Sequence, residues 1–139
     1  MQVKEAMHKG VYWVDPTTPI SDIARLMKDH NIGCLPVGEN DRLVGMVTER
    51  DIVCRGLANG LDLNEATARD VMSKGIFYTT ESASIDDAAA LMEEHRVRRL
   101  PVIDDRKRMT GILSLGDMSH AGEQKLSGEV LNRVGARAA

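Results

Sequence analysis

Two short stretches of this chain carry a hydroxyl and a carboxylate at the same spacing. They read GMVTERD, with Thr48 and Asp51, and GILSLGD, with Ser114 and Asp117. A hydroxyl at a helix start accepts hydrogen bonds from free backbone amides, and that end of a helix attracts phosphate. A carboxylate three residues further on can accept hydrogen bonds from both hydroxyls of a ribose. The spacing predicts a ribose–phosphate clamp at each stretch.

A purely structural interpretation of the same residues stays open. Ser or Thr followed three residues later by an acid is also a helix-capping pattern, and a duplication copies a cap as readily as a binding site. The glycine that begins each stretch, Gly45 or Gly111, favours a ligand because it leaves room for the close approach of a flat group. We therefore expect a ligand site at both stretches, with capping alone as the alternative.

The two stretches occupy equivalent positions in a duplicated unit. Residues 3–37 align with residues 68–102 at an offset of 65, and one inserted residue then raises the offset to 66. A self-match of this length indicates two copies of one structural unit. For the tail of the chain, a dimer-contacting helix, a partner-binding segment and a frayed end remain open. The expected organisation is a first repeat at 1–58, a linker at 59–66, a second repeat at 67–120 and the tail at 121–139.

Each repeat is expected to fold as β-α-β-β-α. Apolar side chains at helical spacing predict an amphipathic helix, and a polar turn between two apolar stretches predicts a hairpin. Two repeats with their sheets packed together, helices outside and one shared core would form an α/β (α+β) fold with a pseudo-twofold axis. The proline of each Leu-Pro-Val motif predicts a short or edge strand. The expected elements are strands at 11–14 and 76–79, helices ending at His30 and His95, hairpins joining CLPV to LVGMV and LPVI to MTGIL, and last helices opened by Thr48 and Ser114.

Composition argues against several classes of protein. The chain has 139 residues, of which 42% are apolar and 28% charged, as in ordinary globular proteins. Its net charge of -3 argues against a dedicated nucleic-acid binder. The N-terminus has no apolar signal region, and no stretch is long enough to cross a membrane. The two cysteines show no paired spacing, so we expect a cytoplasmic protein with reduced thiols and no membrane contact.

Enzyme, metal-binding and nucleic-acid-binding interpretations each rest on weak patterns. ILSLG resembles a nucleophile elbow, but Ile112 stands where that motif has glycine. The four His and two Cys residues match no zinc spacing, and His30 and His95 are expected to close helices, whose free carbonyls favour a donor. The basic run HRVRR at 95–99 is short. We expect no enzyme activity, no metal site and no nucleic-acid partner.

Residues 3–118 resemble a tandem pair of CBS domains, the arrangement called a Bateman module. The resemblance rests on DVM at 70–72, the IARLM and AAALM helices, CLPV and RRLPVID, and above all GMVTERDI and GILSLGDM. It implies a stand-alone regulatory module that senses AMP, ADP or ATP, or NAD or S-adenosylmethionine, without a catalytic cofactor, and with Mg²⁺ entering only with ATP. It also implies a homodimer that acts on a separate, regulated protein. A ligand-independent dimerisation scaffold is the alternative.

The resemblance further implies two clefts, each drawing on both repeats. In the first, the hydroxyl, the carboxylate and an apolar wall residue face the other repeat: Thr48, Asp51 and Met46 against Arg69, Gly75, Phe77, Val97 and Arg98. The second cleft repeats this arrangement: Ser114, Asp117 and Ile112 against Lys4, Gly10, Tyr12, Ile32 and Gly33.

These clefts are expected to differ in their affinity for phosphate-bearing ligands. Phe77 and Val97 would border the base of a bound nucleotide, and the cations would meet its phosphates. Arg offers phosphate a two-pronged contact where Lys offers a single charge. Because Arg69 and Arg98 correspond to Lys4 and Gly33, we expect the Asp51 cleft to hold a phosphate-bearing ligand more tightly.

Overall fold

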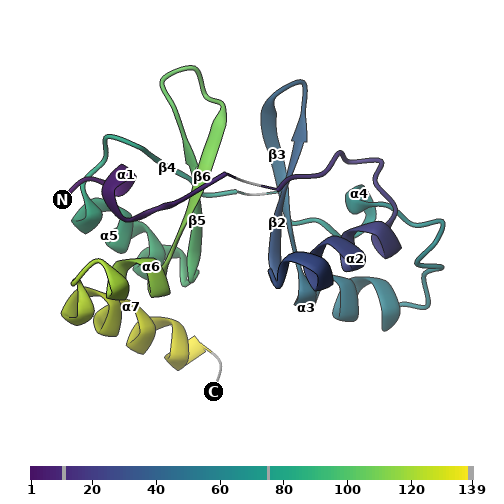
Figure 1. The fold of residues 1–139 in the computed structure, drawn as a ribbon. Coiled ribbons are helices and arrows are strands. Elements are labelled where there is room, and N and C mark those ends of the chain that lie inside the picture. Colours follow the sequence, from purple (N-terminus) through teal and green to yellow (C-terminus); the bar gives the residue numbers. More distant parts are fainter. Residues whose placement is uncertain (11, 75, 138–139) are drawn as a thin grey trace. The chain divides into compact units, whose positions relative to one another are not determined.

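The computed structural model describes residues 1–10, 12–74 and 76–137 (Figure 1), and it divides into two compact units. The Thr48 unit comprises Tyr12–Ile76. The Ser114 unit comprises Met1–Val11 and Phe77–Ala139. Both contain helices and β-strands, which confirms the predicted mixed α/β class.

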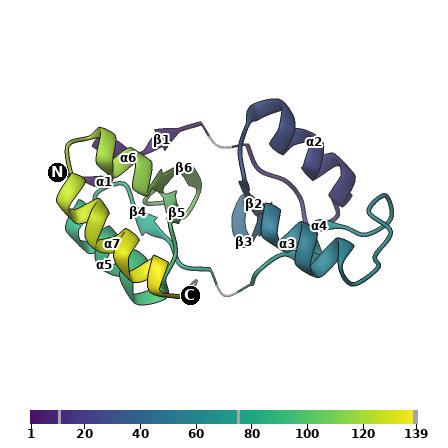
Figure 2. The same cartoon turned by 90° about the horizontal axis from the view of Figure 1, so that it is seen from below.

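The Thr48 unit is a two-stranded hairpin covered by helices. Its strands pair antiparallel from Cys34 opposite Thr48 to Glu39 opposite Arg42. Apolar side chains of α2, α4 and the hairpin form one buried cluster, and α2 and α4 lie to one side of the hairpin (Figure 2). The elements are α2 (Ile20–His30), β2 (Cys34–Glu39), β3 (Arg42–Thr48), α3 (Glu49–Asp51), the π-helical segment η1 (Ile52–Leu57) and α4 (Ala68–Val71).

The Ser114 unit has a four-stranded sheet in the order β1-β6-β5-β4. Strand β5 pairs antiparallel with β6 and parallel with β4. Helices α5, α6 and α7 pack together in this unit (Figure 2). The elements are α1 (Val3–Ala6), β1 (His8–Lys9), β4 (Thr79–Thr80), α5 (Ile85–His95), β5 (Arg99–Ile103), β6 (Met109–Ser114), α6 (Leu115–His120) and α7 (Gln124–Arg137).

The leading segment of each repeat packs into the unit built by the remainder of the other repeat. In the Thr48 unit, the backbone of Ser73 exchanges hydrogen bonds with Met46, at 2.9 and 3.1 Å. In the Ser114 unit, His8 pairs with Ile112, which is the equivalent contact. Each core therefore contains residues from both repeats.

Each unit has a core of its own among the described residues, and the packing of the two sheets on one shared core stays a prediction. The buried apolar side chains of these residues form two clusters, one in each unit. Val3 of α1 lies in the cluster of the Ser114 unit, and Val71 of α4 lies in that of the Thr48 unit. Each core nevertheless combines residues of both repeats, because each leading segment packs in the unit built by the rest of the other repeat.

The predicted first strands at 11–14 and 76–79 are mostly absent from the described residues. Val11 lies outside that part of the chain, and Val14 makes a single parallel bridge to Val37. In the second repeat, β4 begins only at Thr79. The aromatic side chains of these segments are exposed, and Tyr12 and Phe77 stack on histidine rings. Trp13, for example, packs over Gly38, where any Cβ would overlap its ring.

The prolines of the two Leu-Pro-Val motifs fit into their strands because the neighbouring strand does not bond to the proline nitrogen. Strand β5 is an inner strand, so the edge prediction is wrong for Pro101. Its missing N–H does no harm there, because the ladder to β4 begins one residue later, at Val102. On β2, Val14 bonds to the carbonyl of Pro36 and the amide of Gly38, and so bypasses the proline nitrogen.

The main helices end where the sequence predicted. Helices α2 and α5 finish at His30 and His95, followed by Asn31 and Arg96 in the left-handed conformation, with φ of 52° and 54°. The tail forms α7, whose Val130 is fully buried in the core of the Ser114 unit. In the described part of the chain, no helix combines the length and apolarity needed to span a membrane.

Candidate ribose clamps

Both hydroxyl–carboxylate pairs form the same reciprocal helix cap. Thr48 Oγ1 accepts a hydrogen bond from the amide of Asp51 at 3.1 Å, and Asp51 Oδ2 accepts one from the amide of Thr48 at 3.0 Å. The corresponding distances for Ser114 and Asp117 are 3.1 and 2.9 Å. The capping interpretation is therefore correct for both stretches.

The cap leaves part of each carboxylate available. An ionised carboxylate has about four acceptor positions on its two oxygens, and the cap uses Oδ2 alone. Oδ1 of Asp51 and of Asp117 lies outside the cap and keeps acceptor capacity for a ligand. The cap therefore does not compete with a ligand for the remaining oxygen.

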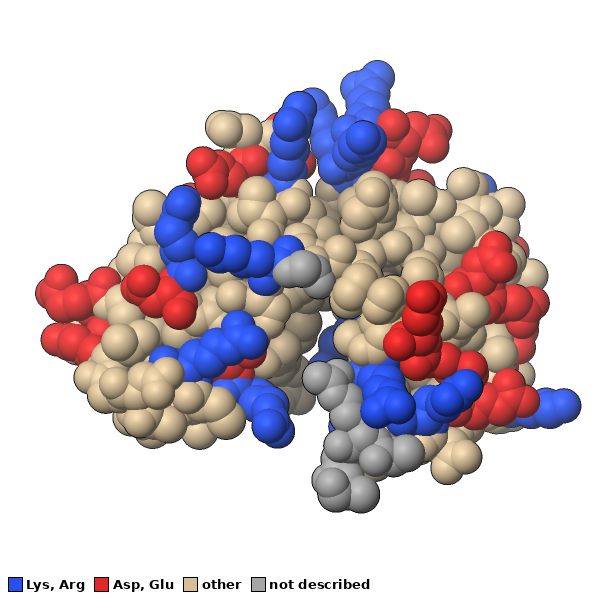
Figure 3. Space-filling model, turned by 180° about the vertical axis from the view of Figure 1, so that it is seen from behind, with Lys and Arg blue, Asp and Glu red and all other residues tan. Residues whose placement is uncertain are grey.

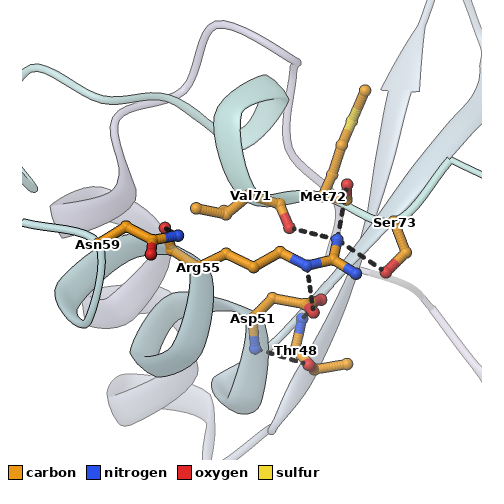
Figure 4. A network of polar contacts seen from close by, with 7 residues as sticks. All are labelled: Thr48, Asp51, Arg55, Asn59, Val71, Met72 and Ser73. Carbon is orange, nitrogen blue, oxygen red and sulfur yellow. Dashed lines mark hydrogen bonds and ion pairs between the residues drawn. The ribbon is translucent and has the colours of Figure 1, made fainter. Parts of the chain in front are cut away.

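Asp51 has a cationic neighbour that the sequence analysis missed. Arg55 Nε lies 3.9 Å from Asp51 Oδ1, and Arg55 Nη1 donates to the carbonyls of Val71 and Met72 at 3.2 Å each and to Ser73 Oγ at 3.4 Å (Figure 4). An acid and a base four residues apart on a helix are the signal that could have revealed this pair.

The glycines that begin the two stretches accommodate the chain itself. A Cβ on Gly45 would lie 2.6 Å from Met72 Sδ and 3.1 Å from the carbonyl oxygen of Ser73. A Cβ on Gly111 would lie 2.5 Å from the carbonyl oxygen of His8. The expectation that these glycines admit a flat ligand is wrong, because the exchanged leading segments occupy the space.

Several other predicted site residues of the Thr48 unit have structural partners. Met46 pairs with Ser73 through its backbone, as described above. Arg69 Nη2 lies 3.5 Å from Glu39 Oε2, with both side chains more than half exposed. Tyr12 stacks on His30, with ring centroids 3.8 Å apart and planes inclined by 19°.

Residues Ile32 and Gly33 follow α2 and lie beside the start of α3. Ile32 packs against the core of the Thr48 unit. The carbonyl of Gly33 accepts the amide of Glu49 at 3.0 Å. A Cβ on Gly33 would lie 2.9 Å from Glu49 Oε1, so a carboxylate covers this glycine. Both residues are thus placed near Thr48, in its own unit.

The Ser114 unit repeats these contacts with different side chains. Phe77 stacks on His95, with centroids 3.4 Å apart and planes inclined by 10°. Val97 packs against the core. The carbonyl of Arg98 accepts the amide of Leu115 at 3.1 Å, next to Ser114. Sequence analysis assigned the two histidines to helix ends and missed that both rings stack on an aromatic residue at the same offset of 65.

The remaining predicted residues are Ile112 on β6, Lys4 and Gly10 in the leading segment of the first repeat, and Gly75. Ile112 pairs with His8 on β1. Lys4 is exposed on α1, and its amide donates to Glu81 at 3.0 Å. Gly10 has φ of 80°, a conformation that favours glycine. Gly75 lies outside the described residues.

Each predicted cleft therefore divides between the two units. Met46, Thr48, Asp51 and Arg69 come together in the Thr48 unit, whereas Phe77, Val97 and Arg98 belong to the Ser114 unit. In the second cleft, Tyr12, Ile32 and Gly33 are the residues in the other unit. The composite clefts stay predictions, but each hydroxyl–carboxylate pair is a property of one unit.

Among the described residues, neither surface charge nor the placement of metal-ligating side chains singles out a further site. On the face drawn in Figure 3, Lys and Arg are interspersed with Asp and Glu, and much of the surface carries neither. Among the described residues, no group of three or more His, Cys, Asp or Glu side chains is arranged to hold a metal ion. Among the described residues, the capped carboxylates and the stacked histidines recur in both units.

Comparison with known sequences connects this duplicated unit to a characterised family. The profile of the CBS domain matches residues 3–55 and 68–123. Hypoxic response protein 1 of Mycobacterium tuberculosis is 44% identical over 117 residues, which are 84% of this chain and 81% of that protein. The two matched segments coincide with the two repeats that carry the clamps.

Solved structures of similar fold hold zinc ions in one case and adenosine compounds in others. A crystal structure of Hypoxic Response Protein I with two coordinated zinc ions has a TM-score of 0.79 at 42% identity, covering 86% of this chain and 98% of that one. CBSX2 in complex with AMP has a TM-score of 0.76 at 28% identity, covering 88% and 96%. The CBS domain pair of protein MJ0100, in complex with 5′-methylthioadenosine and S-adenosyl-L-methionine, has a TM-score of 0.78 at 28% identity, covering 90% and 98%.

Proposed function

This chain belongs to the CBS domain family, and we propose that it is a regulatory module that binds adenosine-containing ligands through its two capped carboxylates. The observation that carries the proposal is the exact duplication of one geometry. Asp51 and Asp117 each hold one oxygen in a helix cap and keep the other outside it. The adenosine compounds in the related structures support the choice of ligand class.

Ribose is the part of these ligands that suits the clamps. AMP, 5′-methylthioadenosine and S-adenosylmethionine differ in their 5′ substituents but share the vicinal hydroxyls of the ribose. A fixed carboxylate oxygen can accept both hydroxyl hydrogens, which is how acidic residues bind ribose in dinucleotide folds. In this proposal Asp51 and Asp117 recognise the ribose, and other residues distinguish the ligands.

The other residues supply the base and phosphate contacts in the proposed clefts. Phe77 and Val97 border the adenine, and Arg69 and Arg98 meet phosphate in the Asp51 cleft. That cleft is accordingly the tighter one for AMP, ADP and ATP, with Mg²⁺ carried by ATP rather than by the protein. NAD and S-adenosylmethionine are further candidates.

The ligand acts by shifting a conformational equilibrium and not by undergoing reaction. A ligand shifts such an equilibrium only by its differential affinity for the two states. The module forms a homodimer and presents the change to a regulated protein, so that its output follows the cellular level of adenosine nucleotides. If the chain binds no adenosine compound, a dimerisation scaffold is the remaining function.

Calorimetric titration with AMP, ADP, ATP, NAD and S-adenosylmethionine tests the proposal. Asp51→Asn and Asp117→Asn remove the charge but keep a capping oxygen, and each should weaken binding at its own clamp at least about tenfold. Asp51→Asn should have the larger effect on phosphate-bearing ligands.

The chain provides a matched control for loss of a cap. Asp70 Oδ2 accepts the amide of Thr67 at 2.9 Å in an equivalent cap at the start of α4, outside both proposed clamps. Asp70→Asn should leave every titration unchanged. Absence of heat with all five ligands, or equal effects of Asp51→Asn and Asp70→Asn, would contradict the proposal.

A further inference from the structure

One difference between the two proposed clamps lies four residues after the carboxylate. Position 55 is Arg, four residues after Asp51, and the equivalent position after Asp117 is Ala121. Arg55 contacts Asp51, whereas Ala121 carries no charge and serves as the C-cap of α6. Among the described residues, the capped carboxylate of Asp51 thus has an ion-pair partner and that of Asp117 has none.

Arg55 is held in place independently of Asp51. Its Nη1 donates to two backbone carbonyls and a hydroxyl at 3.2–3.4 Å (Figure 4). These acceptors belong to 71–73, a segment fixed by the two backbone hydrogen bonds between Ser73 and Met46. The Arg55 side chain is half exposed, and its hydrogen bonds go to two backbone carbonyls and a hydroxyl rather than to the acid.

The distance between Arg55 and Asp51 leaves the acid available to a ligand. At 3.9 Å, Nε and Oδ1 form an ion pair but are too far apart for a hydrogen bond. Oδ1 thus keeps its acceptor positions. The Asp51 side chain is 12% exposed, and the charge of Arg55 offsets part of the cost of holding a carboxylate away from water.

From these contacts we infer that Arg55 is a positioning residue that orients the Asp51 carboxylate for a ribose diol and makes this clamp the more selective of the two. The inference rests on the proposed function. Asp117 has the same cap but no equivalent cation at position 121. The Asp51 clamp should therefore discriminate more strongly than the Asp117 clamp between a ribose and a 2′-deoxyribose.

A purely structural role for Arg55 would give a different result. Its bonds to Val71 and Met72 also fasten the end of α4 to η1, so its loss should lower the stability of the Thr48 unit in either case. A structural role alone would weaken the binding of AMP and of 2′-deoxyAMP by the same factor. The ratio of the two affinities is therefore the informative readout.

The test uses the full chain carrying Asp117→Asn, so that the Asp51 clamp dominates the titration. Arg55→Gln removes the charge but keeps an amide donor, and Arg55→Lys restores a charge. We expect Arg55→Gln to weaken AMP about threefold to tenfold and 2′-deoxyAMP less than about twofold. Arg55→Lys should recover part of the preference for AMP over 2′-deoxyAMP. If Arg55→Gln fails to fold, the affinity ratio of Arg55→Lys is compared with that of the chain that keeps Arg55.

The reverse experiment adds the cation where it is missing. In an Asp51→Asn background, Ala121→Arg should increase the preference of the Asp117 clamp for AMP over 2′-deoxyAMP. An unchanged ratio in Arg55→Gln, with Asp51-dependent binding intact, would overturn the role of Arg55 and leave the proposed function standing. Failure of the unmodified chain to bind AMP would overturn the role of Arg55 in this test, and failure with all five adenosine ligands would overturn both.

Discussion

Replacement of Gly111 by Ala tests whether the exchanged leading segment lies against β6. The new Cβ would lie 2.5 Å from the carbonyl oxygen of His8 and 3.2 Å from Met7 Sδ. Real Cβ atoms do not approach a backbone oxygen so closely, and β1 is held to β6 by its pairing. Either β1 must move away or β6 must distort, so the substitution should destabilise the Ser114 unit.

The magnitude follows from two opposing terms. Overpacking of this kind costs about 1–3 kcal/mol, whereas the restricted unfolded chain of Ala returns about 0.4–1 kcal/mol. The two ranges leave a net loss of about 0–2.6 kcal/mol, and we expect about 1–2 kcal/mol in the free energy of unfolding because the overlap is with the oxygen of a paired backbone. Gly45→Ala should cost less, because its nearest neighbour is the flexible end of Met72.

Urea denaturation followed by circular dichroism measures the effect. Gly128→Ala is the control, since this glycine lies inside α7 and a Cβ there would meet no atom within 4 Å. It should stabilise the chain by up to about 1 kcal/mol. If Gly111→Ala were as stable as the unmodified chain, the backbone of His8 would not lie against this glycine, and the exchange of leading segments would be refuted.

Two further predictions concern packing. Val130→Ala should lower the unfolding free energy by about 2 kcal/mol, because this side chain is fully buried in the Ser114 unit. Leu131→Ala should change it by less than about 0.5 kcal/mol, since Leu131 is 52% exposed. Thermal melts of the two variants compare these effects. Equal effects would contradict the docking of α7. Gly38→Ala should displace the ring of Trp13, the chain's single tryptophan, and shift its fluorescence emission, whereas an unchanged spectrum would contradict their contact.

Much of the local structure was predictable because it depends on neighbours in sequence. The helix ends at His30 and His95 and the caps at Thr48 and Ser114 follow from residues within a few positions of one another. The duplication strengthened each prediction by providing two instances. The site itself, a carboxylate one turn after a capping hydroxyl, is also a local pattern.

The rest depends on contacts between distant segments, which local patterns do not encode. Nothing in GMVTERD indicates that Gly45 faces Met72, since that contact requires the leading segment of one repeat to cross to the other unit. The apolar stretch around Tyr12 was predicted as a strand, but its aromatic side chain is used for stacking on His30. Arg55 is an intermediate case, because its spacing from Asp51 was visible and its three anchoring acceptors were not.

The central claim is that the two capped carboxylates bind the ribose of an adenosine ligand, and a crystal structure of the chain with AMP tests it most directly. The account predicts ribose hydroxyl oxygens about 2.5–3.0 Å from Oδ1 of Asp51, of Asp117 or of both. AMP bound elsewhere on the chain, or bound with its ribose directed away from both carboxylates, would contradict it.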